Sequence, residues 1–287
     1  MEKINHNGKL INKSDFSILL TNRGFKYGDS FFETIKCHLG KPLYWEDHYF
    51  RISSSLLITK MNPPNHFCIE SFKQFIEELL QKNNLCSKSS RLKITFFRNS
   101  SGYYLPDENN TSYIIESESL VSDLYQINKK GLNITFYRDN FISKGPLSNI
   151  KSSNRLINVV SSIYARENSY DDVLLINNNN HIVESSKGNV FIVNNSNNII
   201  TPPLEDGCIN GVVRSVLLRE KRYHILEKSI TFSDIMNAKE VFITNVITGL
   251  CWVAKLGSKS YIKNISIELL SLLNQKCFNL DENQKEL

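Results

Sequence analysis

Lys151 and Glu184 have side chains suited to carbonyl and acid–base chemistry. Lys151 stands in IKSSNRL, and a lysine amine in a closed site can form a Schiff base with a carbonyl cofactor. Glu184 stands in VESSKGNVF at the end of a predicted strand, where a carboxylate can hold a heteroaromatic nitrogen in its protonated state. Taken singly, a lysine and a glutamate are each more typical of the protein surface.

Two further segments are suited to binding a phosphate group. Residues 207–214 (GCINGVVR) lead into a predicted helix, whose first N–H groups and dipole favour an anion. Arg51 follows His48 by three residues on another predicted helix, and its guanidinium can pair bidentately with a phosphate. An ordinary helix start and a solvated helix face explain the same two patterns, so neither segment identifies a site alone.

Composition and charge exclude several classes of protein. The 287 residues carry 34 Lys and Arg against 29 Asp and Glu, and the basic residues are scattered, so no nucleic-acid partner is expected. No apolar run approaches the roughly 20 residues that span a bilayer, and no signal peptide is evident, so we expect a cytoplasmic protein without a membrane partner. The six cysteines contain no CxxC pair and no zinc spacing, so no metal site is predicted.

The elements that must position these residues alternate between strands and helices. In the first half, strands are predicted over 31–37, 43–45, 91–97 and 112–116, and helices over 47–59 and 69–83. In the second half, strands are predicted over 132–137, 173–176, 181–184, 190–193 and 240–245, and helices over 151–167, 211–222 and 265–273. We therefore predict a small N-terminal α/β domain over 1–117, an interdomain linker over 118–130 and a larger C-terminal domain over 131–287.

Five segments occur in an order that points to one family. They are RGFKYGDSFFET (23–34), His48 with Arg51, IKSSNRL (150–156), VESSKGNVF (183–191) and TPPLEDGCINGVVR (201–214). Together they resemble the class IV aminotransferases, the fold-type IV enzymes that use pyridoxal 5'-phosphate (PLP). The resemblance implies an α+β fold of two domains, like that of D-amino-acid aminotransferases, with PLP at the interdomain cleft. It also implies a homodimer in which a loop of the partner closes part of the pocket.

The resemblance assigns roles to three residues. Lys151 matches the lysine that binds PLP as a Schiff base and later moves a proton, and the C-terminal domain is thereby expected to bind the cofactor. Glu184 matches the carboxylate on the pyridine nitrogen, and Arg51 matches the arginine on the phosphate. PLP accepts electrons only while its ring nitrogen is protonated, and a nearby carboxylate favours that charge.

Four more residues are expected near the cofactor. Val212 and Val213 match positions whose backbone N–H groups bind the phosphate, and Asn245, in FITNVITG, matches a position near it in part of the family. Asn189 lies near Glu184 in sequence and is predicted to support the cofactor. A plain turn residue is an equally good explanation of Asn189.

Within the family, the chain most resembles the 4-amino-4-deoxychorismate lyases, which release pyruvate and 4-aminobenzoate for folate synthesis. Lys151 is followed by Asn154, Arg155 and Leu156, similar to the lyase pattern K-x-x-N-R-L, and Asn210 resembles the asparagine of the lyase G-x-x-N-G loop. Thr34 is a candidate catalytic residue that protonates the departing enol, because it shares a strand face with Phe32. A β-branched residue that merely favours the strand explains Thr34 as well.

Two alternatives remain open. The first is an amino-acid transaminase for branched-chain or D-amino acids, with 2-oxoglutarate as acceptor. D-amino-acid enzymes carry an arginine and a histidine in the loop after the strand at 91–97, whereas RNSSGYYLPD contains Arg98 but no histidine. The second is a protein that binds PLP without turnover, against which the intact Lys151 and Glu184 argue.

Overall fold

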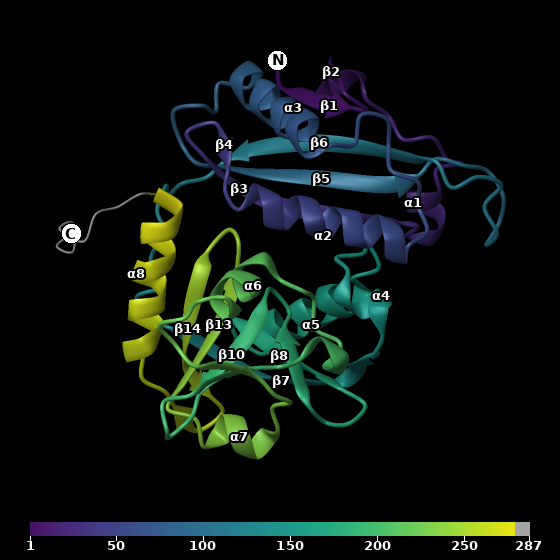
Figure 1. Ribbon diagram of the computed structural model, residues 1–287. Coiled ribbons are helices and arrows are strands. Elements are labelled where there is room, and N and C mark those ends of the chain that lie inside the picture. Colours follow the sequence, from purple (N-terminus) through teal and green to yellow (C-terminus); the bar gives the residue numbers. More distant parts are fainter. Residues whose placement is uncertain (279–287) are drawn as a thin grey trace. The chain divides into compact units, whose positions relative to one another are not determined.

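The computed structural model describes residues 1–278, which form two compact units (Figure 1). Unit 1 comprises Met1–Asp123 together with Ile150–Asn154, and unit 2 comprises Leu124–Asn149 and the residues from Arg155 onward. The expected linker over 118–130 contains the division after Asp123. The return of Ile150–Asn154 to unit 1 was not anticipated, since the sequence pattern assigns Lys151 to the second domain.

Unit 1 is built on a six-stranded antiparallel sheet in the order β2-β1-β6-β5-β3-β4. Its strands are β1 (Lys3–His6), β2 (Lys9–Asn12), β3 (Ser30–His38), β4 (Lys41–Pro42), β5 (Ser90–Arg98) and β6 (Thr111–Ser119). Its helices are α1 (Arg23–Tyr27), α2 (Trp45–Ile58) and α3 (Ile69–Lys82), with a 3₁₀ turn at Lys13–Asp15. A strand expected over 43–45 is wrong, because β4 ends at Pro42 and α2 begins at Trp45.

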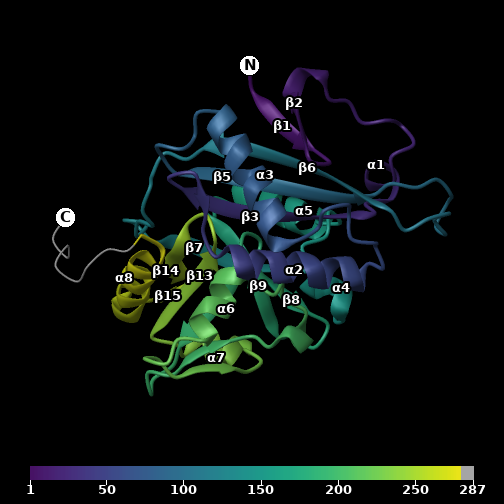
Figure 2. The same ribbon diagram turned by 45° about the horizontal axis from the view of Figure 1, so that its top comes forward.

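One face of this sheet carries the core of unit 1. The helix α3, which lies across the strands in Figure 2, buries Phe72, Ile76, Leu79 and Leu80, the three-to-four-residue spacing of one helical face. Phe31 and Ile35 of β3 pack in the same cluster. Because side chains alternate along a strand, Phe32 and Thr34 lie on the other face of β3.

Unit 2 is built on a mixed nine-stranded sheet, in which β15 pairs with β14 beside the path β12-β11-β10-β13-β14-β7-β8-β9. Its strands are β7 (Leu132–Ile142), β8 (Asp172–Asn177), β9 (Ile182–Ser185), β10 (Asn189–Val193), β11 (Ile199–Thr201), β12 (Ile225–Glu227), β13 (Glu240–Asn245), β14 (Gly249–Leu256) and β15 (Lys259–Ser260). Its helices are α4 (Pro146–Asn149), α5 (Leu156–Glu167), α6 (Val212–Leu218), α7 (Phe232–Met236) and α8 (Asn264–Phe278), with a 3₁₀ turn at Leu204–Asp206.

The helix α5 packs against β7 and β8 through an apolar cluster that includes Ala165, Tyr137, Val173 and Leu175. The strand β8 is buried along its whole length, and β9 and β10 are buried as well. Glu184, on β9, therefore lies in a part of the sheet whose strands are buried from solvent. Within residues 1–278, no helix combines the length and the apolar character needed to span a membrane.

Candidate active site

Lys151 is held by backbone pairing with the start of β3. The Phe32 N–H donates to the Lys151 carbonyl at 2.9 Å, and the Ser153 N–H donates to the Ser30 carbonyl at 2.9 Å. Phe31 and Ser152 form the antiparallel bridge between these two bonds. The helix predicted from residue 151 is therefore wrong at its start, because the backbone around Lys151 bonds to β3 and α5 begins only at Leu156.

The amine of Lys151 lies on the face of β3 that carries Phe32 and Thr34. Lys151 Nζ is 4.5 Å from the centroid of the Phe32 ring, and Lys93 Nζ is 5.3 Å from the same centroid. Lys93 stands directly opposite Thr34 on β5. Thr34 is buried, and its N–H donates to the Glu33 carboxylate at 3.0 Å. Unit 1 thus gathers two lysine amines, an aromatic ring and a hydroxyl on one face.

Arg51 lies in a buried cluster with Glu33 and His48. Its guanidinium donates from Nε to Glu33 Oε2 at 3.0 Å and from Nη2 to Glu33 Oε1. His48 Nδ1 is 3.0 Å from the same Oε1. Burial opposes the charge of Glu33, but Arg51 and His48 outweigh it and hold the pKa of Glu33 at about 2, whereas burial lowers the pKa of His48.

The pairing of Arg51 with Glu33 was not predicted from the sequence. Glu33 is on a strand and Arg51 on a helix 18 residues later, so no local pattern links them. The pairing fixes the orientation of the guanidinium through its Nε and Nη2 edge. A phosphate role for Arg51 remains a prediction.

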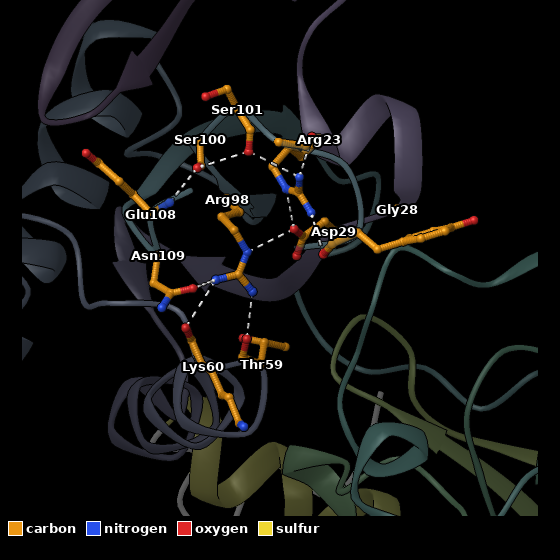
Figure 3. A network of polar contacts seen from close by, with 12 residues as sticks. Arg23, Gly28, Asp29, Thr59, Lys60, Arg98, Ser100, Ser101, Glu108 and Asn109 are labelled. Atoms are coloured by element: carbon orange, nitrogen blue, oxygen red, sulfur yellow. Dashed lines mark hydrogen bonds and ion pairs between the residues drawn. The ribbon is translucent and has the colours of Figure 1, made fainter. Parts of the chain in front are cut away.

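Arg98, the arginine noted above in the sequence RNSSGYYLPD, is bound within unit 1 (Figure 3). It donates to Asp29 Oδ2 at 2.9 Å, to the Thr59 carbonyl at 2.7 Å, to the Lys60 carbonyl at 3.1 Å and to Asn109 Oδ1 at 2.5 Å. These bonds involve all three of its guanidinium nitrogens. Arg98 is also buried, so its position is that of a structural arginine.

Arg23 shares Asp29 with Arg98, and both guanidinium groups point toward that carboxylate in Figure 3. Arg23 also donates to the carbonyls of four consecutive residues, 101–104. It thereby fixes the backbone of a loop in which the side chains of Tyr103, Tyr104 and Leu105 are more than four-fifths exposed. The motif RGFKYGD is explained in part by this clamp.

Glu184 is a buried carboxylate of unit 2, with 2% of its surface exposed. Its Oε2 accepts a hydrogen bond from the Ile209 N–H at 2.9 Å, and its Oε1 lies 3.8 Å from Nη1 of Arg155. Burial lowers the pKa of Arg155, and the charge of Glu184 opposes that shift. Neither the Ile209 donor nor the Arg155 partner was predicted, because both depend on how separate segments pack.

The loop before α6 is fixed by two asparagines. Asn149 donates to the carbonyls of Leu204 and Cys208, both at 2.8 Å. Asn189 donates to the Ile209 carbonyl at 2.8 Å, and its Oδ1 lies 1.9 Å from where a Cβ on Gly211 would stand. Any side chain at 211 would clash, so this close approach requires glycine.

The remaining predicted residues of unit 2 are placed as follows. Val212 and Val213 open α6, where the first N–H groups of a helix have no intrahelical acceptor. Asn245 ends β13, and its Oδ1 accepts from the N–H groups of Ile247 and Thr248, both at 3.0 Å. Its side chain forms the turn before β14, and cofactor binding by Asn245, Asn189, Val212 and Val213 remains a prediction.

Residues 30–256 match the family model for class IV amino-transferases. The chain belongs to this family. It is 25% identical over 245 residues to a protein of Methanocaldococcus jannaschii that has a provisional assignment as branched-chain-amino-acid aminotransferase, covering 84% of this chain and 83% of that protein. It is 24% identical over 259 residues to a D-alanine aminotransferase of Staphylococcus aureus, covering 89% of each chain.

A solved structure from Legionella pneumophila, provisionally assigned as a 4-amino-4-deoxychorismate lyase, is also similar. It is 26% identical, with a TM-score of 0.80, covering 92% of this chain and 97% of that one. The class IV family and its α+β fold with two sheets, which the sequence resemblance implied, are thereby confirmed.

Enzymes of this family use PLP, and the donor groups described above fit that cofactor. A buried carboxylate with an N–H donor and a nearby guanidinium, as at Glu184, suits a charged ring nitrogen. Lys151 supplies an amine. The loop at Gly211 leads into α6, whose first backbone N–H groups can bind a phosphate.

Proposed function

We propose that this protein is a PLP-dependent amino-acid transaminase. The observation that carries the proposal is the environment of Glu184, a buried carboxylate whose two oxygens face a backbone donor and a guanidinium. Burying a carboxylate costs free energy unless hydrogen bonds or an opposite charge compensate, and Glu184 has both kinds of partner. The class IV relatives named as branched-chain and D-alanine aminotransferases support amino-group transfer as the reaction.

The proposed roles divide among the chain's own residues. PLP, when bound, supplies an electron sink for the electrons released at the substrate carbon. Lys151 Nζ would bind its aldehyde carbon and, once the substrate amine has displaced it, accept the proton from the substrate α-carbon. Glu184 would hold the proton on the ring nitrogen. Arg51 and the N–H groups of Val212 and Val213 would bind the phosphate.

The environment of Arg98 favours L-amino acids over D-amino acids as substrates. Its donors already serve Asp29, Asn109 and two carbonyls, so it is poorly placed to bind the carboxylate of a D-amino acid. Branched-chain L-amino acids with 2-oxoglutarate are therefore the first substrates to test.

A second candidate function is 4-amino-4-deoxychorismate lyase activity. Thr34 lies on the face of β3 over which the Lys151 amine is placed, where a hydroxyl could protonate a departing enol. The 26% identity to the Legionella structure and the sequence Asn154-Arg155-Leu156 also favour this reading.

We also propose that the protein acts as a homodimer, as the family resemblance predicts. Exposed apolar side chains on unit 1, at Leu19, Leu20, Tyr104 and Leu105, would suit an interface with a second copy. Light scattering after gel filtration tests this, and a monomer at micromolar concentration would contradict it.

The function is tested in two steps. Borohydride reduction of the PLP-loaded protein, followed by peptide mass spectrometry, should place a phosphopyridoxyl group on Lys151. The protein is then assayed with leucine, isoleucine, valine, D-alanine and 2-oxoglutarate, and separately with aminodeoxychorismate generated in place by its synthase.

Glutamate formation dependent on 2-oxoglutarate would support a transaminase. Pyruvate release that needs no keto acid would instead support the lyase. A phosphopyridoxyl adduct without either activity would favour a protein that binds PLP without turnover, and no adduct on Lys151 would refute both enzyme proposals.

A further inference from the structure

A polar side of α5 lies along the chain that carries Glu184. Arg155 caps the helix and lies 3.8 Å from Glu184 Oε1. One turn later, Asn158 Nδ2 donates to the Ser186 carbonyl at 2.9 Å, and the next turn brings Ser162 Oγ to 3.1 Å from Ser186 Oγ. Positions 155, 158 and 162 share one helical face. The chain at the end of β9 therefore contacts α5 at two residues, Glu184 and Ser186.

Ser186 is also attached to the start of β8. Its N–H donates to the Val173 carbonyl at 3.1 Å, and its Oγ donates to Asp172 Oδ1. Asp172 Oδ1 accepts from the Val173 N–H as well, at 2.8 Å. A chain of hydroxyl bonds thus runs from Ser162 through Ser186 to Asp172, and it fixes the backbone two residues after Glu184.

Asp172 is unusual because it is buried without a cation bonded to it. It is 1% exposed, and its Oδ2 has no hydrogen-bond partner among residues 1–278. An ionised carboxylate with one bare buried oxygen is far less stable than a neutral carboxyl in the same place. Burial accordingly raises the pKa of Asp172.

The elements packed around Asp172 contribute few charges. Lys187, in the loop after β9, and Cys251, on β14, are the titratable side chains that interact with it within the described part of the chain. The helix α5 contributes the uncharged Asn158 and Ser162. On β7, the residue opposite Asp172 is the apolar Ile134. Nothing in this set approaches the bidentate pairing that holds Glu33 ionised in unit 1.

We propose that Asp172, as a neutral carboxyl, and Ser186 are positioning residues that hold Glu184 in place for the ring nitrogen of the cofactor. This inference rests on the proposed role of Glu184. Asp172 and Ser186 act through the backbone at the end of β9 and do not touch the cofactor themselves.

The test uses holoenzyme loaded with PLP that carries ¹⁵N in its ring, so that the ¹⁵N chemical shift reports protonation of the ring nitrogen. In Ser186→Ala and Asp172→Ala, the protonated fraction of the ring nitrogen should fall. The value of kcat should drop about tenfold, which is the effect of one lost hydrogen bond, and KM for the amino donor should change little. Asp172→Asn is isosteric with a neutral carboxyl and should keep both readouts within about threefold. The exposed neighbour Asp171, changed to Asn, is the matched control.

The outcomes separate the two proposals. If Glu184→Gln leaves the ¹⁵N shift unchanged, the proposed role of Glu184 fails and the inference fails with it. If Glu184→Gln moves the ¹⁵N shift but Ser186→Ala does not, the inference alone is overturned. The Ser186→Ala variant provides this test even if Asp172→Ala does not fold. If Asp172→Asn behaves like Asp172→Ala, Asp172 acts as an ionised group and the neutral assignment is wrong.

Discussion

Lys151 and Glu184 are fixed by different means in the two units. In unit 1, the position of Lys151 is set by backbone hydrogen bonds to the edge of β3, and its amine lies 4.5 Å from the centroid of the Phe32 ring. In unit 2, the Glu184 carboxylate itself is bound, by the Ile209 N–H and beside Arg155. The first arrangement fixes the backbone from which the long Lys151 side chain starts. The second fixes the carboxylate at the end of the Glu184 side chain.

This difference matches what each residue would have to do. A lysine that binds an aldehyde and later moves a proton needs a side chain that can turn, and its four-carbon stem allows this once the backbone is anchored. A carboxylate that holds a proton on a ring nitrogen needs a fixed side chain, since rotation would separate it from the protonated nitrogen. Each prediction below tests one side of this contrast.

The largest effect is expected for Lys151→Ala. Because backbone bonds hold the segment, the variant should fold, yet it should lose at least about a thousandfold in activity, as removal of a nucleophile does. It should also yield no phosphopyridoxyl adduct at residue 151 by mass spectrometry. Lys93→Ala, which removes the other lysine near Phe32, is the control and should keep the adduct. Substantial activity in Lys151→Ala would contradict the central assignment.

A somewhat smaller effect is expected for Glu184→Gln. The amide keeps the shape of the side chain but not its charge, so PLP should remain bound while kcat falls on the order of a hundredfold. Absorbance titration gives the PLP affinity, and steady-state assays give the rate. The exposed Glu205, changed to Gln, is the control. A rate near that of the unchanged protein would mean that another group holds the ring nitrogen.

The sequence predicted some parts of this site and not others. It located α3 over 69–83 and β13 over 240–245 because apolar side chains repeat at the helix or strand period within each segment. It misplaced Lys151, because Ser152, Ser153 and Asn154 follow it on a path set by hydrogen bonds to β3, more than a hundred residues earlier.

The partners of the site residues were missed for a related reason. Glu33 with Arg51, Arg155 with Glu184, and Asp29 with Arg98 join segments that are distant along the chain or belong to different elements. No local period encodes such pairs. Motif order was sufficient to identify the family and its candidate residues, but the charges that surround them depend on packing.

A stability effect is expected for Glu33→Gln, in the cluster that orients Arg51. Removing one partner of a buried ion pair leaves the other charge uncompensated, so the free energy of unfolding should fall by about 3 kcal/mol at pH 7. The pKa of Glu33 is about 2 in the folded protein, below its ordinary value of 4.5. Its stabilisation is therefore complete above about pH 5 and is lost as the pH falls from there toward 2.

Urea unfolding of both proteins at pH 7 and pH 3 measures this effect. The difference between Glu33→Gln and the unchanged protein should shrink at pH 3. A difference that stays constant with pH would mean that the ion pair with Arg51 contributes little and that the variant acts through packing.

The smallest effect is expected for Thr34→Val, which removes a hydroxyl and keeps the β-branched shape. If the protein is a transaminase, transamination should change by no more than about twofold, because Lys151 alone moves the proton. If it is a lyase, pyruvate release should slow by about tenfold or more while PLP stays bound. A coupled lactate dehydrogenase assay measures the second rate, so this variant also separates the two candidate functions.

The detour of Ile150–Asn154 into unit 1 has a consequence for how the protein is made. As the chain leaves the ribosome, the edge of β3 at Ser30 and Phe32 lacks its hydrogen-bond partners until the residues beyond Asn154 have emerged. Unit 1 therefore cannot be completed until the first segment of unit 2, Leu124–Asn149, has been made. For the same reason, a cut after Asp123 separates the lysine from the strand that places it, and neither fragment alone would hold the amine in position.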